Sequence, residues 1–219
     1  MSLKPAVFAL FRRFWPVLVV LLALPVQAEP ERSPEQVIRG SIDELVSQID
    51  GRRDYFADNM DELEALVDDS LDDIADFRYI GASVMGRYFR NATPQQRSRF
   101  VDTFRQTLID TYAKGLVTFD YAELRVLDTQ QPPRHEDQAS VSMEVVATDG
   151  TIYPVSYTLR LTDGQWKVVN VIVNGINLGL TFRNQFDQAM RDHGRDYGAV
   201  IDAWAPELDV DELEEGGGA

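Results

Sequence analysis

The fold is decided by one stretch, Trp166-Lys-Val-Val-Asn-Val-Ile-Val-Asn-Gly-Ile-Asn-Leu-Gly-Leu-Thr-Phe-Arg-Asn-Gln-Phe186. Its first half is rich in β-branched residues and presents two alternating apolar rows, which predicts a strand covered on both faces. Asn174-Gly175 interrupts the strand. Phe182, Phe186 and Met190 then recur at four-residue spacing, which predicts the buried stripe of a helix. A strand that leads directly into a helix forms a corner, and such corners line pockets.

Three further strands are predicted before this one. Alternating apolar residues begin at Tyr121, and later runs are centred on Met143 and Tyr157. Asp163-Gly164 predicts a two-residue hairpin turn before Trp166. This turn pairs Leu161 with Trp166, Leu159 with Val168, Tyr157 with Asn170, and Val155 with Ile172. All of these residues are therefore expected to share one face of the sheet.

The turn at Gly150 is predicted from what each alternative would bury. A two-residue loop would place the carboxylate of Glu144 on the apolar face, because a shift of one residue moves every side chain to the other side. A three-residue loop with a left-handed Gly150 avoids this. It pairs Val145 with Tyr153, Met143 with Val155, and Val141 with Tyr157.

Helices are predicted both before and after the strands in the sequence. Capping boxes at Ser33-Pro34-Glu35-Gln36 and Thr93-Pro94-Gln95-Gln96 begin two of them. Another helix is predicted at about 60–71. A short helix should end near Gly86, and a longer one near Gly194. A last short helix is predicted around 197–204. The pattern indicates an α+β fold with a four-stranded antiparallel sheet. One domain is expected over residues 29–206, with a helical layer at 33–118, the sheet at 121–174 and C-terminal helices at 180–205.

The two ends of the chain are expected to lie outside this domain. Lys4, Arg12 and Arg13 precede a short apolar run, and Val26-Gln27-Ala28 offers small residues for cleavage, which is typical of a signal peptide at 1–28. Its removal changes the net charge from −15 to −18. Such acidity argues against nucleic-acid binding. Residues 207–219 are acidic and glycine-rich, which predicts a disordered tail.

The sequence offers little for catalysis. It contains no cysteine, and neither of its two histidines lies in a triad-like arrangement. No phosphate loop or metal-ligand spacing is present, and Asp72, Asp73 and Asp76 lack the spacing of a calcium loop. Asn170 stands out as a polar residue in an apolar row. Its partner is expected to be either the Tyr157 hydroxyl or a polar group of a ligand.

Charge is distributed unevenly along the chain. Residues 41–76 contain thirteen acidic side chains and two arginines, whereas residues 78–105 contain six arginines and one aspartate. Long runs of one charge usually form a solvated face. The basic segment also offers candidates for docking or for contact with phosphate.

The motifs together resemble the MlaC family, also called the toluene-tolerance family. They are Asp76-Phe77, Met85-Gly86-Arg87-Tyr88-Phe89-Arg90, Ala92-Thr93-Pro94-Gln95-Gln96, the pair Phe100 and Phe104 with Thr111-Tyr112, Trp166 to Leu178, and Phe182-Arg183-Asn184-Gln185-Phe186. The resemblance covers residues 33–204. The family often has Trp where this chain has Phe89, and Asp where it has Asn170.

The resemblance implies a periplasmic phospholipid carrier that is not an enzyme and needs no cofactor. Such carriers move lipid between an outer-membrane lipoprotein–porin complex and an inner-membrane ABC transporter complex with its membrane-anchored substrate-binding subunit, and so maintain outer-membrane lipid asymmetry. The implied fold resembles the nuclear-transport-factor-like cone, a curved sheet wrapped by helices, with a helical extension and an acyl-chain cavity. A monomer is expected, because no long apolar helix is left unpaired.

These expectations define a candidate site. The acyl slot is expected between the sheet and the helices, lined by Phe104, Leu108, Tyr112, Val145, Val155, Tyr157, Leu159, Val168, Asn170, Ile172, Ile176, Leu178, Phe182 and Phe186. Docking or headgroup contact is assigned to Arg87, Arg90, Arg97 and Arg183. Two alternatives stay open: an enzyme of the cone fold that acts on an apolar substrate, and a periplasmic lipoprotein carrier or chaperone.

Overall fold

A computed structural model describes residues 32–128 and 135–206. The expected signal peptide, the extended loop at 131–134 and the acidic tail lie outside the described residues. The helices are α1 (Pro34–Ile49), α2 (Arg53–Asp58), α3 (Met60–Ile74), α4 (Phe77–Met85), η1 (Gly86–Asn91), α5 (Pro94–Thr118), α6 (Leu178–Asp192) and α7 (Tyr197–Asp202). The strands are β1 (Tyr121–Val126), β2 (Gln138–Ala147), β3 (Ile152–Thr162), β4 (Gln165–Val173) and β5 (Ile176–Asn177).

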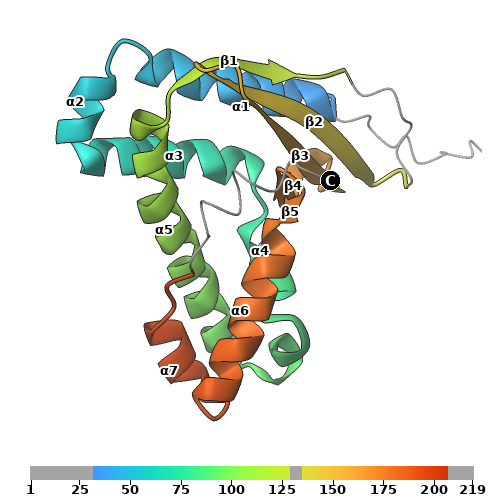
Figure 1. The fold of residues 1–219 in the computed structure, drawn as a ribbon. Helices are drawn as coiled ribbons and strands as arrows, with labels where there is room; N and C mark the ends of the chain where they lie inside the picture. The colour runs from blue at the N-terminus through green and yellow to red at the C-terminus, as the bar shows by residue number, and fades with distance from the viewer. Residues whose placement is uncertain (1–31, 129–134, 207–219) are drawn as a thin grey trace, which may run out of the picture.

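The strands form one antiparallel sheet in chain order, β1 to β5. Figure 1 shows this curved sheet with α1 lying along it, α3 beneath α1, and a column of α4, α5, α6 and α7 extending away. The α+β class and the antiparallel meander are confirmed. The sheet has five strands instead of four, because Ile176 and Asn177 pair with the end of β4 before α6 begins.

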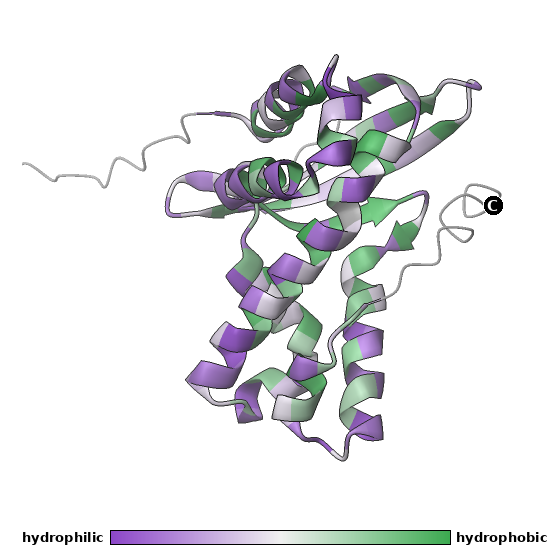
Figure 2. Ribbon diagram, turned by 90° about the vertical axis from the view of Figure 1, so that its left-hand side faces the viewer, coloured by the Kyte–Doolittle hydropathy of each residue, from purple (hydrophilic) through white to green (hydrophobic). Residues whose placement is uncertain are grey.

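Local sequence signals explain where several helices begin. Ser33 and Thr93 each accept a hydrogen bond from the backbone N–H three residues later, and both predicted capping boxes are present. Each satisfies donors that a helix start leaves unpaired. In Figure 2, hydrophilic and hydrophobic bands alternate along these helices, as amphipathic helices require. The six-residue α2 was not predicted, because it is too short to show a periodic pattern.

The sheet register confirms part of the prediction. Val145 pairs with Tyr153, Met143 with Val155, and Val141 with Tyr157, as the left-handed Gly150 at φ +88° permits. Asp163 and Gly164 both have positive φ, at 52° and 79°, which is the geometry of a primed two-residue turn.

A β-bulge overturns the rest of the predicted register. Leu159 pairs with Val168, but Thr158 pairs with Asn170, so Val169 is an extra residue in β4. Beyond the bulge Tyr157 faces Val171 instead of Asn170, and Val155 faces Val173 instead of Ile172. Asn170 and Ile172 therefore lie on the opposite face of the sheet from Tyr157.

The apolar side chains form three clusters. One joins the inner face of the sheet to α1, a second fills the bundle of α4, α5, α6 and α7, and a third lies among the end of α1, α2, α3 and α5. Among the described residues, no helix is long and apolar enough to cross a membrane.

Candidate functional site

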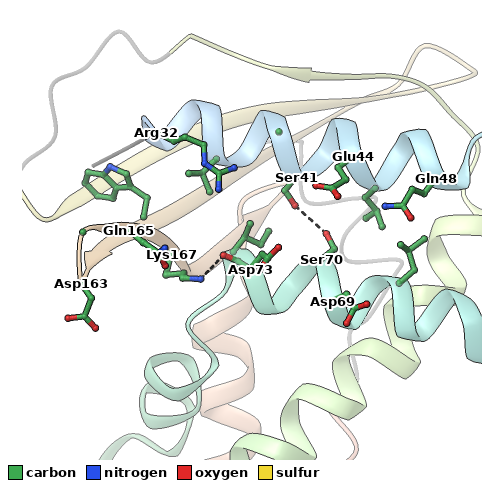
Figure 3. A pocket seen from close by; sticks show the side chains of 17 residues that line it. Arg32, Ser41, Glu44, Gln48, Asp69, Ser70, Asp73, Asp163, Gln165 and Lys167 are labelled. Carbon is green, nitrogen blue, oxygen red and sulfur yellow. Dashed lines mark hydrogen bonds between the residues drawn. The ribbon is translucent and has the colours of Figure 1, made fainter. Parts of the chain in front are cut away.

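A cavity of about 750 Å³ lies between α1, α3 and the β3–β4 turn. This volume falls in the range of ligand cavities. The apolar wall is formed by Val37, Leu45, Leu66, Ile74 and Trp166. The polar lining comprises Arg32, Ser41, Glu44, Gln48, Asp69, Ser70, Asp73, Asp163, Gln165 and Lys167, together with Gly40 and Gly164 (Figure 3).

The cavity opens into the sheet cluster. Val37, Ile74 and Trp166 line the cavity and also belong to the apolar cluster between α1 and the sheet. The hollow therefore adjoins the start of β4 and the edge of the apolar cluster between α1 and the sheet.

Separate contacts hold the two helical walls. On the α1 side, the Arg39 guanidinium donates to the Val126 carbonyl at 3.0 Å. On the α3 side, Arg105 bonds the carboxylates of Asp68 at 2.6 Å and Asp72 at 2.7 Å. Lys167 Nζ adds a 2.5 Å bond to the Asp73 carbonyl at the end of α3, where a cation is favourable. Thus α1 is fixed to the sheet, while α3 is fixed to α5 and β4.

A weak polar contact bridges the two walls. The Ser41 and Ser70 hydroxyls lie 3.3 Å apart and point toward each other across the cavity (Figure 3). Gly40 precedes Ser41, and a Cβ at this position would meet no atom within 4 Å. This part of α1 therefore faces open space, which bulky side chains could fill.

The lining of the cavity carries both signs of charge. Figure 3 shows Arg32 and Lys167 on the side nearest the β3–β4 turn, whereas Glu44 and Asp69 extend from the middle of α1 and α3. Asp73 lies beside Lys167. A polar or zwitterionic group could be accommodated at this rim, with the apolar wall behind it.

The inner face of the sheet is covered only in part. Val155, Leu159 and Val168 are buried under α1 and its neighbours. Further along the same face the apolar side chains are only half-buried, and these are Val145, Tyr157, Val171 and Val173. The structure thus leaves apolar surface accessible beside the cluster that walls the cavity.

Tyr157 carries a polar group into this apolar face. Its hydroxyl has one contact among the described residues, a 4.0 Å approach to Met143 Sδ. Sulfur is a weak acceptor, so the hydroxyl is poorly satisfied. Burial raises the pKa of the Tyr157 hydroxyl to about 12, because the charged form would lose its hydration.

The predicted helical wall lies in a different cluster from the sheet residues. Phe104, Phe182 and Phe186 pack with Phe100 and Trp204 in the bundle, where the Phe100 and Phe186 ring centroids are 4.7 Å apart. Leu108 and Leu178 are half-buried at the edge of this bundle. The main partners of α5 are α2, α3, α4 and α7 rather than the strands. Tyr112 lies on α5, and its side chain is outside the described set.

Asn170 has a structural partner that the sequence did not predict. Its Oδ1 accepts a hydrogen bond from the Gly179 N–H at 3.1 Å, in the first turn of α6. The expected Tyr157 partner is wrong, because the bulge places the two side chains on opposite faces. Ile172 pairs with Asn177, and Ile176 pairs with Val173, so both lie where the sheet passes into α6.

Three of the four selected arginines make contacts within the bundle. Arg87 forms an ion pair with Asp187 and bonds the Tyr88 hydroxyl at 3.0 Å. Arg97 Nε donates to the Phe89 carbonyl at 2.9 Å, and Arg183 Nε donates to the Ser83 carbonyl at 2.7 Å. Arg90 is exposed on η1.

The sequence interpretation missed the cavity residues on α1 and α3. Ser41 and Ser70 are distant in the chain, and no local pattern joins them. The interior glycine of α1, Gly40, was an available signal, because glycine costs a helix about 1 kcal/mol relative to alanine. No cluster of metal-ligating side chains occurs in the described ranges, and Asp76 caps α4 by accepting from the Tyr79 N–H at 2.9 Å.

Comparisons with known proteins agree with this architecture. The chain is 35% identical over 195 residues to the toluene tolerance protein ttg2D of Pseudomonas putida, covering 88% of this chain and 89% of that protein. It is 20% identical over 152 residues to the intermembrane phospholipid transport system binding protein MlaC of Haemophilus influenzae, covering 68% and 70%.

A solved structure shares the fold. The phospholipid-binding protein from Ralstonia solanacearum, determined in complex with a phospholipid, superposes with a TM-score of 0.70 at 23% identity, covering 85% of this chain and 97% of that one. The model of the MlaC protein family matches residues 39–206. Since that match spans most of the chain, this protein belongs to the MlaC family.

Proposed function

We propose that this protein binds phospholipid and carries it through the periplasm. The observation that supports this most directly is the 750 Å³ cavity, whose apolar wall continues into a half-covered sheet face. The related Haemophilus influenzae protein is named for phospholipid transport, and the Ralstonia solanacearum protein holds a phospholipid.

The energetics of an acyl chain require a dry, apolar site. At about 0.8 kcal/mol for each buried CH₂, a 16-carbon chain gains on the order of 12 kcal/mol on leaving water. A carrier must offer comparable burial while the lipid crosses an aqueous compartment. Trp166, Val37 and Ile74 begin such a surface, and the inner face of β2, β3 and β4 extends it.

We place the acyl chains against the sheet face and the headgroup at the polar rim. The rim carries Arg32 and Lys167 as well as Glu44, Asp69 and Asp73, so it does not favour one charge strongly. Weak selectivity among headgroups is therefore expected. A strong preference for one headgroup in the extracted lipid would contradict this placement.

We further propose that the lipid travels between an outer-membrane lipoprotein–porin complex and an inner-membrane ABC transporter, and thereby maintains outer-membrane lipid asymmetry. Membership of the MlaC family and the signal-peptide pattern at 1–28 support this address and these partners. The protein is expected to act as a monomer after cleavage at Ala28.

Arg90 is the best candidate for partner docking, because its side chain is exposed and the other selected arginines have partners within the bundle. Arg90→Glu should slow lipid delivery to a reconstituted partner while leaving lipid binding unchanged. Arg195→Glu, a reversal of an exposed arginine beyond α6, is the matched control. Equal delivery by both variants would remove Arg90 from the docking surface.

The experiment that tests the proposed function is native mass spectrometry of protein purified from the periplasm, followed by solvent extraction and lipid analysis. A fixed ratio of intact phospholipid to protein is expected, and the mass counts the acyl chains. Protein that stays ligand-free under gentle handling would contradict the carrier. Covalently protein-bound acyl groups would indicate a lipoprotein carrier, and turnover of an apolar substrate would indicate an enzyme.

A further inference from the structure

Tyr157 is a polar side chain on an otherwise apolar face. Its strand partners on both sides, Val141 and Val171, are valines, and Val155 and Leu159 flank it along β3. Phenylalanine would fill the same space without bringing a hydroxyl group. The fold itself therefore gives no packing reason for the hydroxyl.

The hydroxyl lacks a good partner within the described part of the protein. Its contact with Met143 Sδ at 4.0 Å is at the limit of a sulfur hydrogen bond. A donor on an apolar face that has only a weak partner is poorly satisfied, so a ligand that brings an acceptor to it gains a hydrogen bond. This hydroxyl also keeps its proton at every physiological pH, since burial raises its pKa to about 12, and it is therefore always available as a donor.

A ligand can reach this position. Tyr157 is half-buried, and so are its neighbours Val145, Val171 and Val173 on the same face. These side chains present an apolar surface with one donor near its centre. The surface suits an apolar chain that carries a neutral acceptor.

We propose that the Tyr157 hydroxyl donates a hydrogen bond to an acyl ester carbonyl of the bound lipid, and so selects ester-linked over ether-linked lipid. The acceptor is an ester and not a phosphate, because a phosphate would bring a full charge onto this apolar face. This inference rests on the proposed function and adds the part of the lipid that the protein recognises.

The test compares two ligands and three proteins. A diacyl phosphatidylcholine and its dialkyl ether analogue, with identical chains and headgroup, are titrated into delipidated wild type, Tyr157→Phe and Tyr153→Phe. Tyr153 lies on the same strand and packs edge to face against Phe119, so it is a matched control. Thermal unfolding of each ligand-free variant checks that it is folded.

Wild type and Tyr153→Phe should bind the ester lipid about fivefold more tightly than the ether lipid, the net effect of one neutral hydrogen bond. Tyr157→Phe should bind both equally, at the wild-type affinity for the ether lipid. Equal binding of both lipids by wild type, or an equal loss for both in Tyr157→Phe, would overturn the role of Tyr157 alone. Absence of binding by every protein would instead contradict the proposed function.

Discussion

The helical bundle and the sheet layer use apolar residues in opposite ways. In the bundle, Phe100, Phe104 and Phe186 are fully buried, and their rings contact one another and Trp204 in edge-to-face or tilted arrangements. On the sheet, Tyr157 and Val173 stay half-buried, and a cavity opens beside them. A closed aromatic core fixes the scaffold, whereas incompletely covered apolar surface is what a lipid carrier needs.

The helices that wall the cavity and the helices of the bundle also differ in charge. Acidic side chains are concentrated between residues 41 and 76, which include the second half of α1 and all of α3, whereas arginines dominate residues 78–105. Among these arginines, Arg87 and Arg97 are engaged in contacts inside the bundle. A surface with an excess of acidic side chains repels anionic membrane surfaces.

The largest expected difference between the two regions is in stability. Phe186→Ala should lower the free energy of unfolding by about 3–5 kcal/mol, because it opens a void in a closed aromatic core. Val173→Ala should cost about 1 kcal/mol or less, because the site is half-buried. Guanidinium unfolding of both ligand-free variants measures the difference, and similar losses at the two positions would break the comparison.

The second prediction concerns alkaline pH. The Tyr157 hydroxyl loses its proton near pH 12 in the folded protein and near pH 10 when unfolded. The stability from burying the neutral form is therefore complete below pH 10, and roughly 2–3 kcal/mol of it is lost between pH 10 and 12. Wild type should lose this amount of stability relative to Tyr157→Phe over that interval, because phenylalanine has no group that titrates. A constant difference would show that the hydroxyl is hydrated.

The third prediction sharpens the placement of the ligand. Gly40→Trp should fill the cavity and weaken phospholipid binding at least tenfold, about 1.4 kcal/mol. Gly40→Ala should leave binding unchanged and stabilise α1 by up to about 1 kcal/mol. Gly115→Trp places the same bulk on α5, also in open space, and serves as the control. Equal binding by both tryptophan variants would exclude the cavity from the lipid site.

The smallest expected effect lies at the junction of the two regions. Asn170→Ala removes the acceptor for the Gly179 N–H and should cost about 1 kcal/mol. The separate variant Asn170→Asp keeps an acceptor and places a negative charge at the start of α6, so its stability should equal that of wild type. Thermal unfolding separates the two variants, and a loss of lipid without a loss of stability in Asn170→Ala would reassign this residue to the ligand.

The parts of the fold that local patterns encode were predictable. The capping boxes at Ser33 and Thr93 and the turns at Gly150 and Asp163-Gly164 set helix starts and the β2–β3 register. The bulge at Val169 was not predictable, because strict alternation through β4 is equally compatible with an unbroken strand. One extra residue moved Asn170 and Ile172 to the other face.

The candidate site was predictable only in part. The inner face of the sheet followed from alternation, and Val155, Tyr157, Leu159 and Val168 do share it. The helices that cover this face could not be predicted, because an apolar stripe on a helix does not specify which neighbour it packs against. The stripe of Phe104 and Phe186 closes the bundle, while α1 and α3, whose approach depends on tertiary packing, form the cavity.

Site-specific fluorescence quenching tests the central claim most directly. Trp166 lies in the cavity wall and Trp204 in the bundle core, while Trp15 lies within the expected signal peptide. Phospholipid with brominated acyl chains should quench Trp166 in the exported Trp204→Phe variant and leave Trp204 unquenched in the Trp166→Phe variant. Quenching of Trp204 without quenching of Trp166 would place the lipid in the bundle and contradict the account.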